Sequence, residues 1–293
     1  MNDAGRLRRT LEAGEFILAP GIYDMLSALI ADRMGFAALY VTGFGVSASH
    51  LGLPDAGFAT YTDMLERVSR MAEATQTPII ADADTGFGGL INVRHTVRGY
   101  EAAGASGIQL EDQEFPKKCG HTPGRRVIPT RDMVAKIAVA ADARRSDDFL
   151  IVARTDSRTT LGLDEALRRG EAYAQAGADL IFIESPESEA ELAAIAERIE
   201  TPLVANIVEG GRTPVLSAER LKALGFSLAI RPVLGLLAAT RALETAYAEL
   251  KCSGDAASTP VADFGALCTL LGFDEVHAFD RRWADPADAV TGK

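Results

Sequence analysis

Eight short apolar runs, rich in β-branched residues, recur along the chain and alternate with segments of helical spacing. Each run is almost continuously apolar, which is typical of a strand that is covered on both faces. Glycines such as Gly104 and Gly177 stand where the intervening helices should end. The predicted strands are residues 16–19, 38–42, 78–82, 107–111, 149–153, 179–183, 202–205 and 227–230.

Eight strand–helix units within about 250 residues is the count of a (β/α)8 barrel. We therefore predict a barrel over residues 1–250. Residues 251–293 are predicted to form a linker, a short apolar helix at 264–271 and a polar tail that belong to the same domain. A doubly wound open sheet shows the same alternation and is the competing interpretation. A helical extension of this kind commonly covers a neighbouring subunit or is exchanged with it.

The chain is acidic, with 30 Lys and Arg against 41 Asp and Glu and a net charge of −11. It lacks the basic surface of a nucleic-acid-binding protein, and an anionic membrane would repel it. No apolar run approaches the length of a membrane span. The first 15 residues are polar throughout, which predicts no signal peptide, and three cysteines make no disulfide framework. These features predict a soluble, cytoplasmic protein.

Polar residues follow nearly every predicted strand. In a (β/α)8 barrel the C-terminal ends of the strands converge on one mouth, where the active site lies. The alternative is that the strand ends simply meet solvent. The residues at these ends are Thr42, Asp82, Asp84, Glu111, Asp112, Arg154, Asp156, Glu184, Asn206 and Arg231.

The sequence ADADTGFG at residues 81–88 places two carboxylates beside each other. Asp82 and Asp84 are two residues apart on a strand, so they point to the same side. Paired carboxylates are the hard oxygen ligands that Mg²⁺ or Mn²⁺ prefers, and Glu111 on the next strand is placed to complete the site. An ordinary Asp-x-Asp-x-Gly turn is the alternative.

A second motif, KKCGH at residues 117–121, lies in a long connection over residues 112–129. Connections of this length are commonly lids. Cys119 is flanked by Lys117 and Lys118 and followed by His121; cationic neighbours lower the pKa of a thiol, so a reactive Cys119 is predicted. An exposed loop cysteine without a role is the alternative. The glycine-rich turn at 209–212 is too short to predict a phosphate site.

Together, ADADTGFG, LED, KKCGH, ARTD, a Glu after the sixth strand and ANIVEGGRTP resemble the isocitrate lyase/phosphoenolpyruvate mutase superfamily over residues 16–245. The most similar branch is that of the short lyases, which act on small 2-hydroxy di- and tricarboxylates. This resemblance implies a barrel with an exchanged C-terminal helix, a homotetramer and Mg²⁺ at the rim.

The resemblance also implies roles for individual residues. Asp82 and Asp84 would hold the metal, with Asp55 and Glu111 in its outer shell. Cys119 would protonate the departing carbanion, and Arg154 would neutralise the developing oxyanion. The remaining residues of the implied site are Lys117 and His121 on the mobile loop, the backbone turn Thr42, Gly43 and Phe44, and the substrate contacts Gly120, Glu184 and Asn206.

One departure from the methylisocitrate lyases bears on the substrate. Arg231 stands where they usually carry a tyrosine, and Leu237 stands where they carry an arginine for the extra carboxylate. Leu237, Leu234 and Phe44 suggest an apolar pocket, which favours a substituted malate such as 2,3-dimethylmalate. Arg231 would replace the missing cation if its side chain pointed into the mouth.

Three alternatives remain open at this point. They are cleavage of 2-methylisocitrate, the chemistry of the phosphonopyruvate and carboxyphosphonate mutases, and a non-catalytic barrel that binds a dicarboxylate. The resemblance implies that the phosphonopyruvate mutase branch lacks a cysteine on this loop, so Cys119 argues against that branch.

Overall fold

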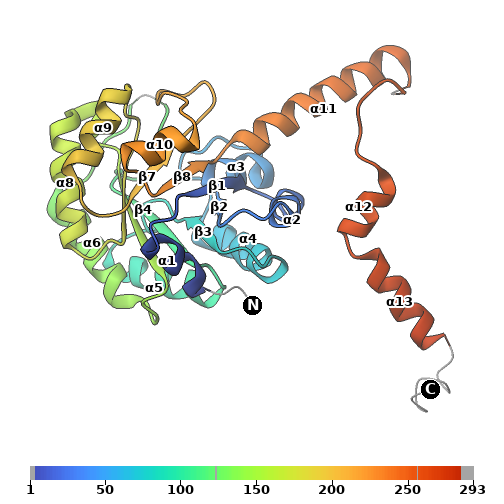
Figure 1. Ribbon diagram of the computed structural model, residues 1–293, viewed down its shortest axis with the longest axis horizontal. Coiled ribbons are helices and arrows are strands. Elements are labelled where there is room, and N and C mark those ends of the chain that lie inside the picture. The colour runs from blue at the N-terminus through green and yellow to red at the C-terminus, as the bar shows by residue number, and fades with distance from the viewer. Residues whose placement is uncertain (1–3, 123, 256, 285–293) are drawn as a thin grey trace. The chain divides into compact units, whose positions relative to one another are not determined.

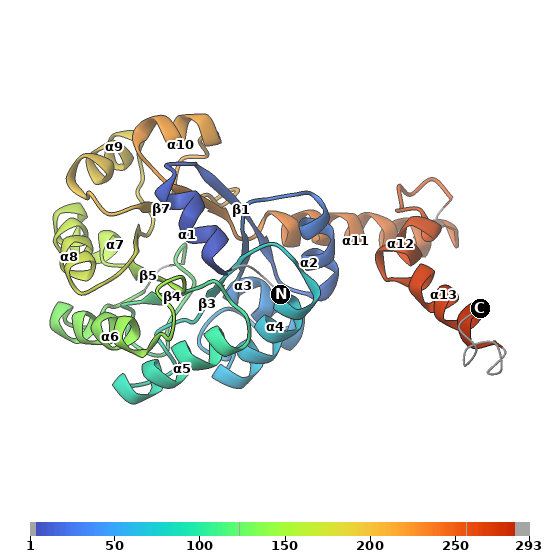
Figure 2. The same ribbon diagram turned by 60° about the horizontal axis from the view of Figure 1, so that its bottom comes forward.

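The computed structural model describes residues 4–122, 124–255 and 257–284, which contain a closed barrel of eight parallel strands in chain order (Figures 1 and 2). The strands are β1 (Ile17–Ile22), β2 (Leu39–Val41), β3 (Ile79–Asp82), β4 (Gly107–Glu111), β5 (Leu150–Thr155), β6 (Leu180–Ile183), β7 (Leu203–Asn206) and β8 (Leu228–Arg231). Strand β8 pairs with β1, Leu228 opposite Ile17. The predicted barrel is confirmed, and the open sheet is excluded.

All eight predicted strands overlap observed ones, and the largest difference is at β1. The predicted strand ends at Ala19, ahead of Pro20 and Gly21, which are residue types that usually indicate a turn. In the structure the strand continues to Ile22, and Pro20 lies opposite Arg231. A side chain at Gly21 would lie 2.0 Å from the Pro232 carbonyl oxygen, so close backbone approach explains the glycine.

Helices surround the strands in chain order, as Figure 2 shows. They cover the outer face of the barrel and enclose one continuous apolar layer; α4 shows how, because its buried residues Met64, Val68 and Met71 recur at helical spacing. The elements are α2 (Met25–Arg33), α3 (Gly43–Val46), the π-helical turn η1 (Ser47–Leu51), α4 (Tyr61–Ala74), α5 (Leu90–Ala102), α6 (Thr130–Ala143), α7 (Arg158–Leu161), α8 (Leu163–Gln175), α9 (Glu189–Arg198) and α10 (Ala218–Leu224).

The N-terminal segment, expected only to be polar, forms helix α1 (Ala4–Glu12). Its Leu7 is fully buried and packs in one cluster with Ile17 and Leu228 at the N-terminal ends of the strands. Two leucines, Leu7 and the partly buried Leu11, among charged residues were too weak a pattern to predict this helix. Helix α1 therefore closes one end of the barrel, which leaves the C-terminal end for the site.

The chain divides into two compact units, Met1–Ala238 and Ala239–Lys293, with the boundary inside α11 (Leu234–Ser253). In the second unit, α12 (Phe264–Leu270) matches the predicted apolar helix. The expected polar tail instead contains α13 (Phe273–Trp283), because Phe273, Val276 and Phe279 recur at helical spacing. Assignment of residues 251–293 to the barrel domain, and exchange of the last helices between subunits, stay predictions.

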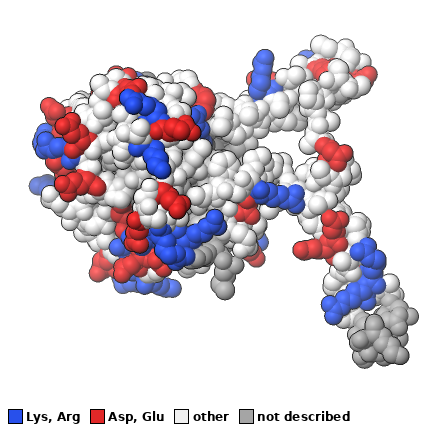
Figure 3. All heavy atoms as spheres, in the orientation of Figure 1, with Lys and Arg blue, Asp and Glu red and all other residues white. Residues whose placement is uncertain are grey.

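Acidic and basic side chains are interspersed over the visible face of the barrel unit (Figure 3). None of the helices in the described ranges is long and apolar enough to cross a membrane.

Candidate active site

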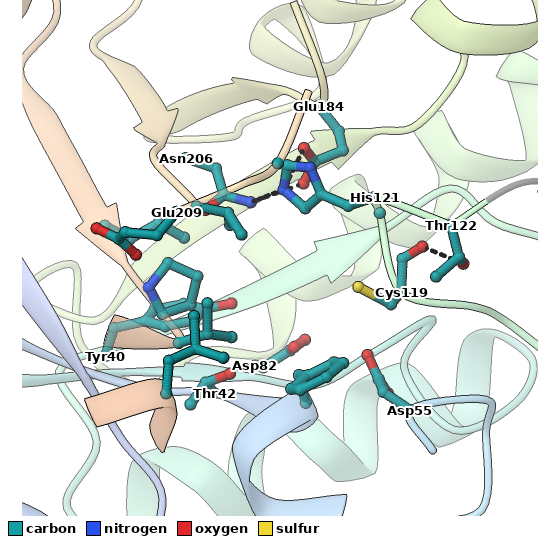
Figure 4. A pocket seen from close by; sticks show the side chains of 18 of the residues that line it. Tyr40, Thr42, Asp55, Asp82, Cys119, His121, Thr122, Glu184, Asn206 and Glu209 are labelled. Atoms are coloured by element: carbon teal, nitrogen blue, oxygen red, sulfur yellow. Dashed lines mark hydrogen bonds and ion pairs between the residues drawn. The ribbon is translucent and has the colours of Figure 1, made fainter. Parts of the chain in front are cut away.

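A cavity of about 270 Å³ lies at the C-terminal ends of the strands. Its walls come from elements far apart in the sequence: Thr42 follows β2, Asp82 ends β3 and Asn206 ends β7. The connection over residues 112–129, here called the 112–129 loop, contributes Cys119 and His121 (Figure 4). The predicted strand-end residues and the predicted loop motif therefore meet in one place.

Most of the predicted site residues line this cavity. They are Thr42, Phe44, Asp55, Asp82, Cys119, Gly120, His121, Arg154, Glu184 and Asn206. Three others, Asp84, Glu111 and Lys117, are buried and contact the lining residues without lining the cavity themselves. Gly43 lies against Asp82, and Arg231 does not reach the cavity.

The resemblance implies that backbone N–H groups of the 42–44 turn bind the substrate, but two of these groups already have partners within the protein. The Thr42 N–H donates to the Ile22 carbonyl at 3.1 Å, and the Gly43 N–H donates to Asp82 Oδ2 at 3.3 Å. A side chain at Gly43 would lie 2.7 Å from that same Asp82 oxygen. In this structure the turn therefore holds the Asp82 carboxylate, and a substrate would have to compete for the Gly43 donor.

Four carboxylates, those of Asp55, Asp82, Asp84 and Glu111, lie around the single ammonium group of Lys117. Lys117 Nζ bonds to Asp55 and lies 2.7 Å from Asp84 Oδ1. The Asp84 N–H donates to Asp82 Oδ1 at 3.0 Å, which joins the two predicted metal ligands. Burial lowers the pKa of Lys117, yet the carboxylates of Asp84 and Asp55 outweigh this and raise it well above its usual range.

This cluster has more negative charge than its own cation compensates. Burial, with the Asp82 and Asp55 carboxylates, raises the pKa of Asp84 to about 7 despite the adjacent Lys117. Burial also raises the pKa of Glu111 well above its usual range, and Glu111 Oε1 is buried without a hydrogen-bond partner. No three His, Cys, Asp or Glu side chains within the described ranges already surround a common metal position. The possible metal ligands are nevertheless hard carboxylate oxygens whose negative charge exceeds the charge of Lys117. The residues present therefore fit a divalent cation such as Mg²⁺.

Arg154 also lines the cavity, from the end of β5. Its Nη2 lies 3.2 Å from Glu184 Oε2, and its Nε lies 3.4 Å from Glu111 Oε2. The guanidinium carbon stands 5.0 Å from the centre of the Phe182 ring, which packs beneath it. Arg154 therefore presents a buried cation to the cavity, linked through Glu111 to the carboxylate cluster.

Glu184, Asn206 and His121 form a hydrogen-bonded group beside Arg154 (Figure 4). Asn206 Nδ2 lies 3.0 Å from Glu184 Oε2 and 3.2 Å from His121 Nε2. Burial lowers the pKa of His121 although the Glu184 carboxylate opposes the shift, so the imidazole is neutral at pH 7. The group therefore offers the neutral side chains of Asn206 and His121 beside the Glu184 carboxylate, and adds no second cation.

The expectation of a low pKa for the Cys119 thiol is wrong. Burial raises the pKa of Cys119 to about 11. Neither neighbouring lysine offsets this, because Lys117 turns to Asp55 and Asp84, and Lys118 Nζ donates to the Gly124 carbonyl at 3.3 Å. The sulfur points into the cavity between His121 above and Asp55 and Asp82 below (Figure 4). Cys119 is thus a protonated thiol at neutral pH, suited to giving a proton rather than to nucleophilic attack.

Gly120 has no room for a side chain. A methyl group there would lie 2.3 Å from Arg154 Nη2 and 2.7 Å from Glu184 Oε2. We expect Gly120→Ala to lower kcat/KM about 100-fold, because the loop and the arginine must move apart. Steady-state kinetics measure this, with Gly235→Ala as the control since its added methyl meets only ordinary contacts. Equal activity of the two variants would contradict the close packing.

Arg231 and the apolar wall differ from the expectations. Arg231 Nη1 pairs with Glu209 Oε1 at 2.7 Å, and its Nη2 donates to the Leu216 carbonyl, so it points away from the mouth. Leu234 does not line the cavity either. The apolar wall is formed by Phe44, Val208, Ile230, Pro232, Val233 and Leu237. The 209–212 turn, expected to be a plain turn, contributes Glu209, Gly210 and Gly211 to the lining.

Sequence reasoning missed two groups that surround Arg154. Asp156 was noted only as a strand-end carboxylate, although its i, i+2 relation to Arg154 puts both on one side of β5. Arg125 carried no signal at all, because nothing in the local sequence links it to β5. In the structure Asp156 forms ion pairs with both Arg125 and Arg154.

Residues 7–251 match the sequence model of the phosphoenolpyruvate phosphomutase family. The chain is 47% identical over 286 residues to the 2,3-dimethylmalate lyase of Eubacterium barkeri, covering 97% of this chain and 99% of that protein. It is 44% identical over 248 residues to the 2-methylisocitrate lyase of Aeropyrum pernix, covering 85% and 80%.

Solved structures agree. Oxaloacetate acetylhydrolase in complex with the product oxalate superposes with a TM-score of 0.89 at 33% identity, covering 96% of this chain and 98% of that one. The family match and the identity over nearly the whole length carry the assignment. The chain belongs to the phosphoenolpyruvate mutase/isocitrate lyase superfamily of enzymes.

Proposed function

We propose that this protein is a magnesium-dependent lyase that cleaves the C2–C3 bond of a substituted malate, such as 2,3-dimethylmalate, to a 2-oxo acid and a carboxylate. One observation carries the proposal. A single cavity of about 270 Å³ is lined by a protonated thiol, a buried arginine and a carboxylate of the hard-oxygen cluster. These are the three groups that splitting a 2-hydroxy acid beside a carboxylate requires.

The metal site of the proposal is built from the acidic cluster. Asp82 and Asp84 would hold Mg²⁺, or Mn²⁺ in its place, with Asp55 and Glu111 contacting it through water. When bound, such a cation polarises the 2-hydroxyl and the adjacent carboxylate of the substrate. Lys117, which pairs with Asp84 in this structure, keeps its bond to Asp55 as an alternative partner.

The chain's own groups supply the remaining chemistry. As the C2–C3 bond breaks, its electron pair passes to C3 and C2 becomes a carbonyl carbon. Arg154 faces the cavity to bind the negative oxygen that develops, and the Cys119 thiol gives its proton to C3. The proton lost from the hydroxyl restores the thiol, so the net reaction needs no other reactant. Glu184 and Asn206 orient the substrate from the β6 and β7 ends of the cavity.

The apolar wall supports a methyl-substituted dicarboxylate. Val208, Ile230 and Leu237 line this part of the cavity, whereas Arg231 does not line it and is paired with Glu209. A third carboxylate placed here would be buried without a partner cation, which costs several kcal/mol. Methyl groups meet no such penalty.

We therefore expect kcat/KM for 2,3-dimethylmalate to exceed that for 2-methylisocitrate by about tenfold or more, roughly 1.4 kcal/mol in transition-state binding. The 2-oxo acid product is measured for both substrates on one preparation. A tenfold preference for the tricarboxylate would overturn the assignment and point to Arg231 as the missing cation. Arg231→Leu then decides that point, since it would lower activity on the tricarboxylate selectively.

We also propose that the protein is a homotetramer in which the C-terminal helices pack on a partner subunit. Within the second compact unit, α12 and α13 expose large apolar side chains, which supports burial in an assembly. They include Phe264, Phe273, Val276, Phe279 and Trp283. Light scattering coupled to size-exclusion chromatography gives the mass; a chain of 31.1 kDa that elutes as a monomer contradicts this.

A further inference from the structure

The orientation of Arg154 is set by Asp156, two residues later in the chain. Arg154 Nε lies 2.9 Å from Asp156 Oδ2, and Arg154 Nη2 lies 2.9 Å from Asp156 Oδ1. This paired contact holds the planar guanidinium in one direction. Glu111 and Glu184 also attract Arg154, at 3.4 and 3.2 Å, but through single, longer contacts. Asp156 is therefore the group that fixes where the arginine points.

The backbone at Asp156 is itself held by hydrogen bonds to the Asp112 carboxylate. Its N–H donates to Asp112 Oδ1 at 2.9 Å, and the Thr155 hydroxyl donates to Asp112 Oδ2 at 2.7 Å. Asp112 also accepts from Arg169 and from the Tyr173 hydroxyl. The backbone that carries Asp156 thus has little freedom, and its carboxylate is a firm reference point for Arg154.

A second arginine reaches the same carboxylate from the 112–129 loop. Arg125 Nη1 lies 2.7 Å from Asp156 Oδ1, the oxygen that also accepts from Arg154 Nη2. Its Nη2 donates to the Thr159 hydroxyl at 2.7 Å, and the residue is only 3% exposed. Although burial alone raises the pKa of Asp156, the two arginines lower it, so the shared carboxylate stays ionised.

The 112–129 loop thus lies against the catalytic arginine of the proposed reaction at Gly120, and is linked to it indirectly, through Asp156, at Arg125. From the cavity side Gly120 packs directly on Arg154 and Glu184, and its carbonyl accepts a hydrogen bond from Ser185 Oγ at 3.0 Å. From behind, Arg125 contacts Asp156. Both contacts lie on the loop that carries Cys119, so loop position and arginine orientation are mechanically linked.

We propose that Arg125 is a positioning residue that couples the placement of the Cys119 loop to the orientation of Arg154 through Asp156. This inference rests on the proposed function for its kinetic test alone. The thiol and the arginine act on the same bond-breaking step, so both must be in place together. Arg125 makes one arrangement of the loop correspond to one arrangement of the arginine.

Arg125→Gln tests the proposal, with Arg126→Gln as the matched control. Arg126 is the next residue, and its side chain is 80% exposed and pairs with Glu114 at the surface. We expect Arg125→Gln to lower kcat about 100-fold through misplacement of the reacting groups. KM should change by less than about threefold, since no side chain that lines the cavity is itself replaced. Arg126→Gln should keep wild-type values.

A second readout needs no turnover. Oxalate, which the related oxaloacetate acetylhydrolase binds as its product, is added with Mg²⁺ during alkylation of Cys119, and the rate is followed by mass spectrometry. Wild type and Arg126→Gln should be protected as the loop settles over the ligand, whereas Arg125→Gln should lose most of that protection. A role in stability alone would lower the melting temperature without separating these rates among the folded molecules.

The outcomes are distinct. Wild-type kcat and wild-type protection in folded Arg125→Gln overturn the coupling. If Arg125→Gln does not fold, Arg125→Lys replaces it, because it keeps the buried charge but cannot bond Asp156 and Thr159 in the same fork. Wild-type behaviour of that variant overturns the proposal equally. A wild-type protein that cleaves no 2-hydroxy acid, yet loses protection on Arg125→Gln, rejects the proposed function while supporting the coupling.

Discussion

Replacing Cys119 with serine is expected to lower kcat about 100- to 10,000-fold, the range that a positioned proton donor contributes. The thiol has a pKa of about 11 in this cavity, so it is protonated at neutral pH and remains a far stronger acid than a serine hydroxyl. Serine keeps nearly the same shape and occupies the same position between His121 and Asp82. The loss should therefore fall on kcat, whereas binding of oxalate with Mg²⁺, measured by calorimetry, should stay close to wild type.

Cys252→Ser is the matched control, because Cys252 is exposed on α11 and is not among the residues that line the cavity. It should keep full activity. Alkylation should likewise inactivate wild type and Cys252→Ser, and oxalate should slow it. Near-normal turnover of Cys119→Ser would remove the thiol from the mechanism and return the assignment of the proton donor to His121 or Lys117.

The fold was predictable because its main determinant is repeated eight times in the sequence. Every strand is covered on both faces, so each appears as a short apolar run, and helices of regular spacing separate them. The position of the site followed from the same regularity, since strand ends converge at one rim. Helix α1 was not predicted, because its position depends mainly on one buried side chain, that of Leu7.

The direction in which each side chain points once the barrel is closed could not be predicted from the sequence. Lys117 is two residues from Cys119 in the chain, yet its ammonium group lies between Asp55 and Asp84, and the thiol is left to burial alone. Arg231 stands at the end of β8 like a rim residue but pairs with Glu209. Charged residues that are neighbours in the sequence need not be neighbours in space, because a long side chain can extend to a buried group of opposite charge elsewhere in the fold.

Contacts between distant segments were equally hidden. Arg125 and Asp156 are 31 positions apart, and they follow the neighbouring strands β4 and β5, whose parallel pairing brings the two segments together. No local pattern marks either residue as a partner of the other. The residues with roles in the proposed chemistry were found by motif, whereas those that orient them emerged only from the three-dimensional contacts.

Removal of the metal should abolish the proposed activity, and Asp84→Asn should do the same. Polarisation by a divalent cation is worth several kcal/mol, so we expect kcat/KM to fall about 1,000-fold or more in either case. Activity should return on adding Mg²⁺ or Mn²⁺ to the chelated wild type, and it should not return in the variant. The release of product is measured before and after chelation on the same preparation.

The same change has a readout that is independent of turnover. A cation bound only by the folded protein raises its melting temperature as its concentration increases. Mg²⁺ should therefore stabilise wild type and the control Asp142→Asn, whose side chain is exposed on α6, but should leave the melting temperature of Asp84→Asn nearly unchanged. Asn keeps the shape of the buried carboxylate, so the fold should persist without it. Full activity in excess chelator, or equal stabilisation of Asp84→Asn, would show that the acidic cluster serves Lys117 and not a metal.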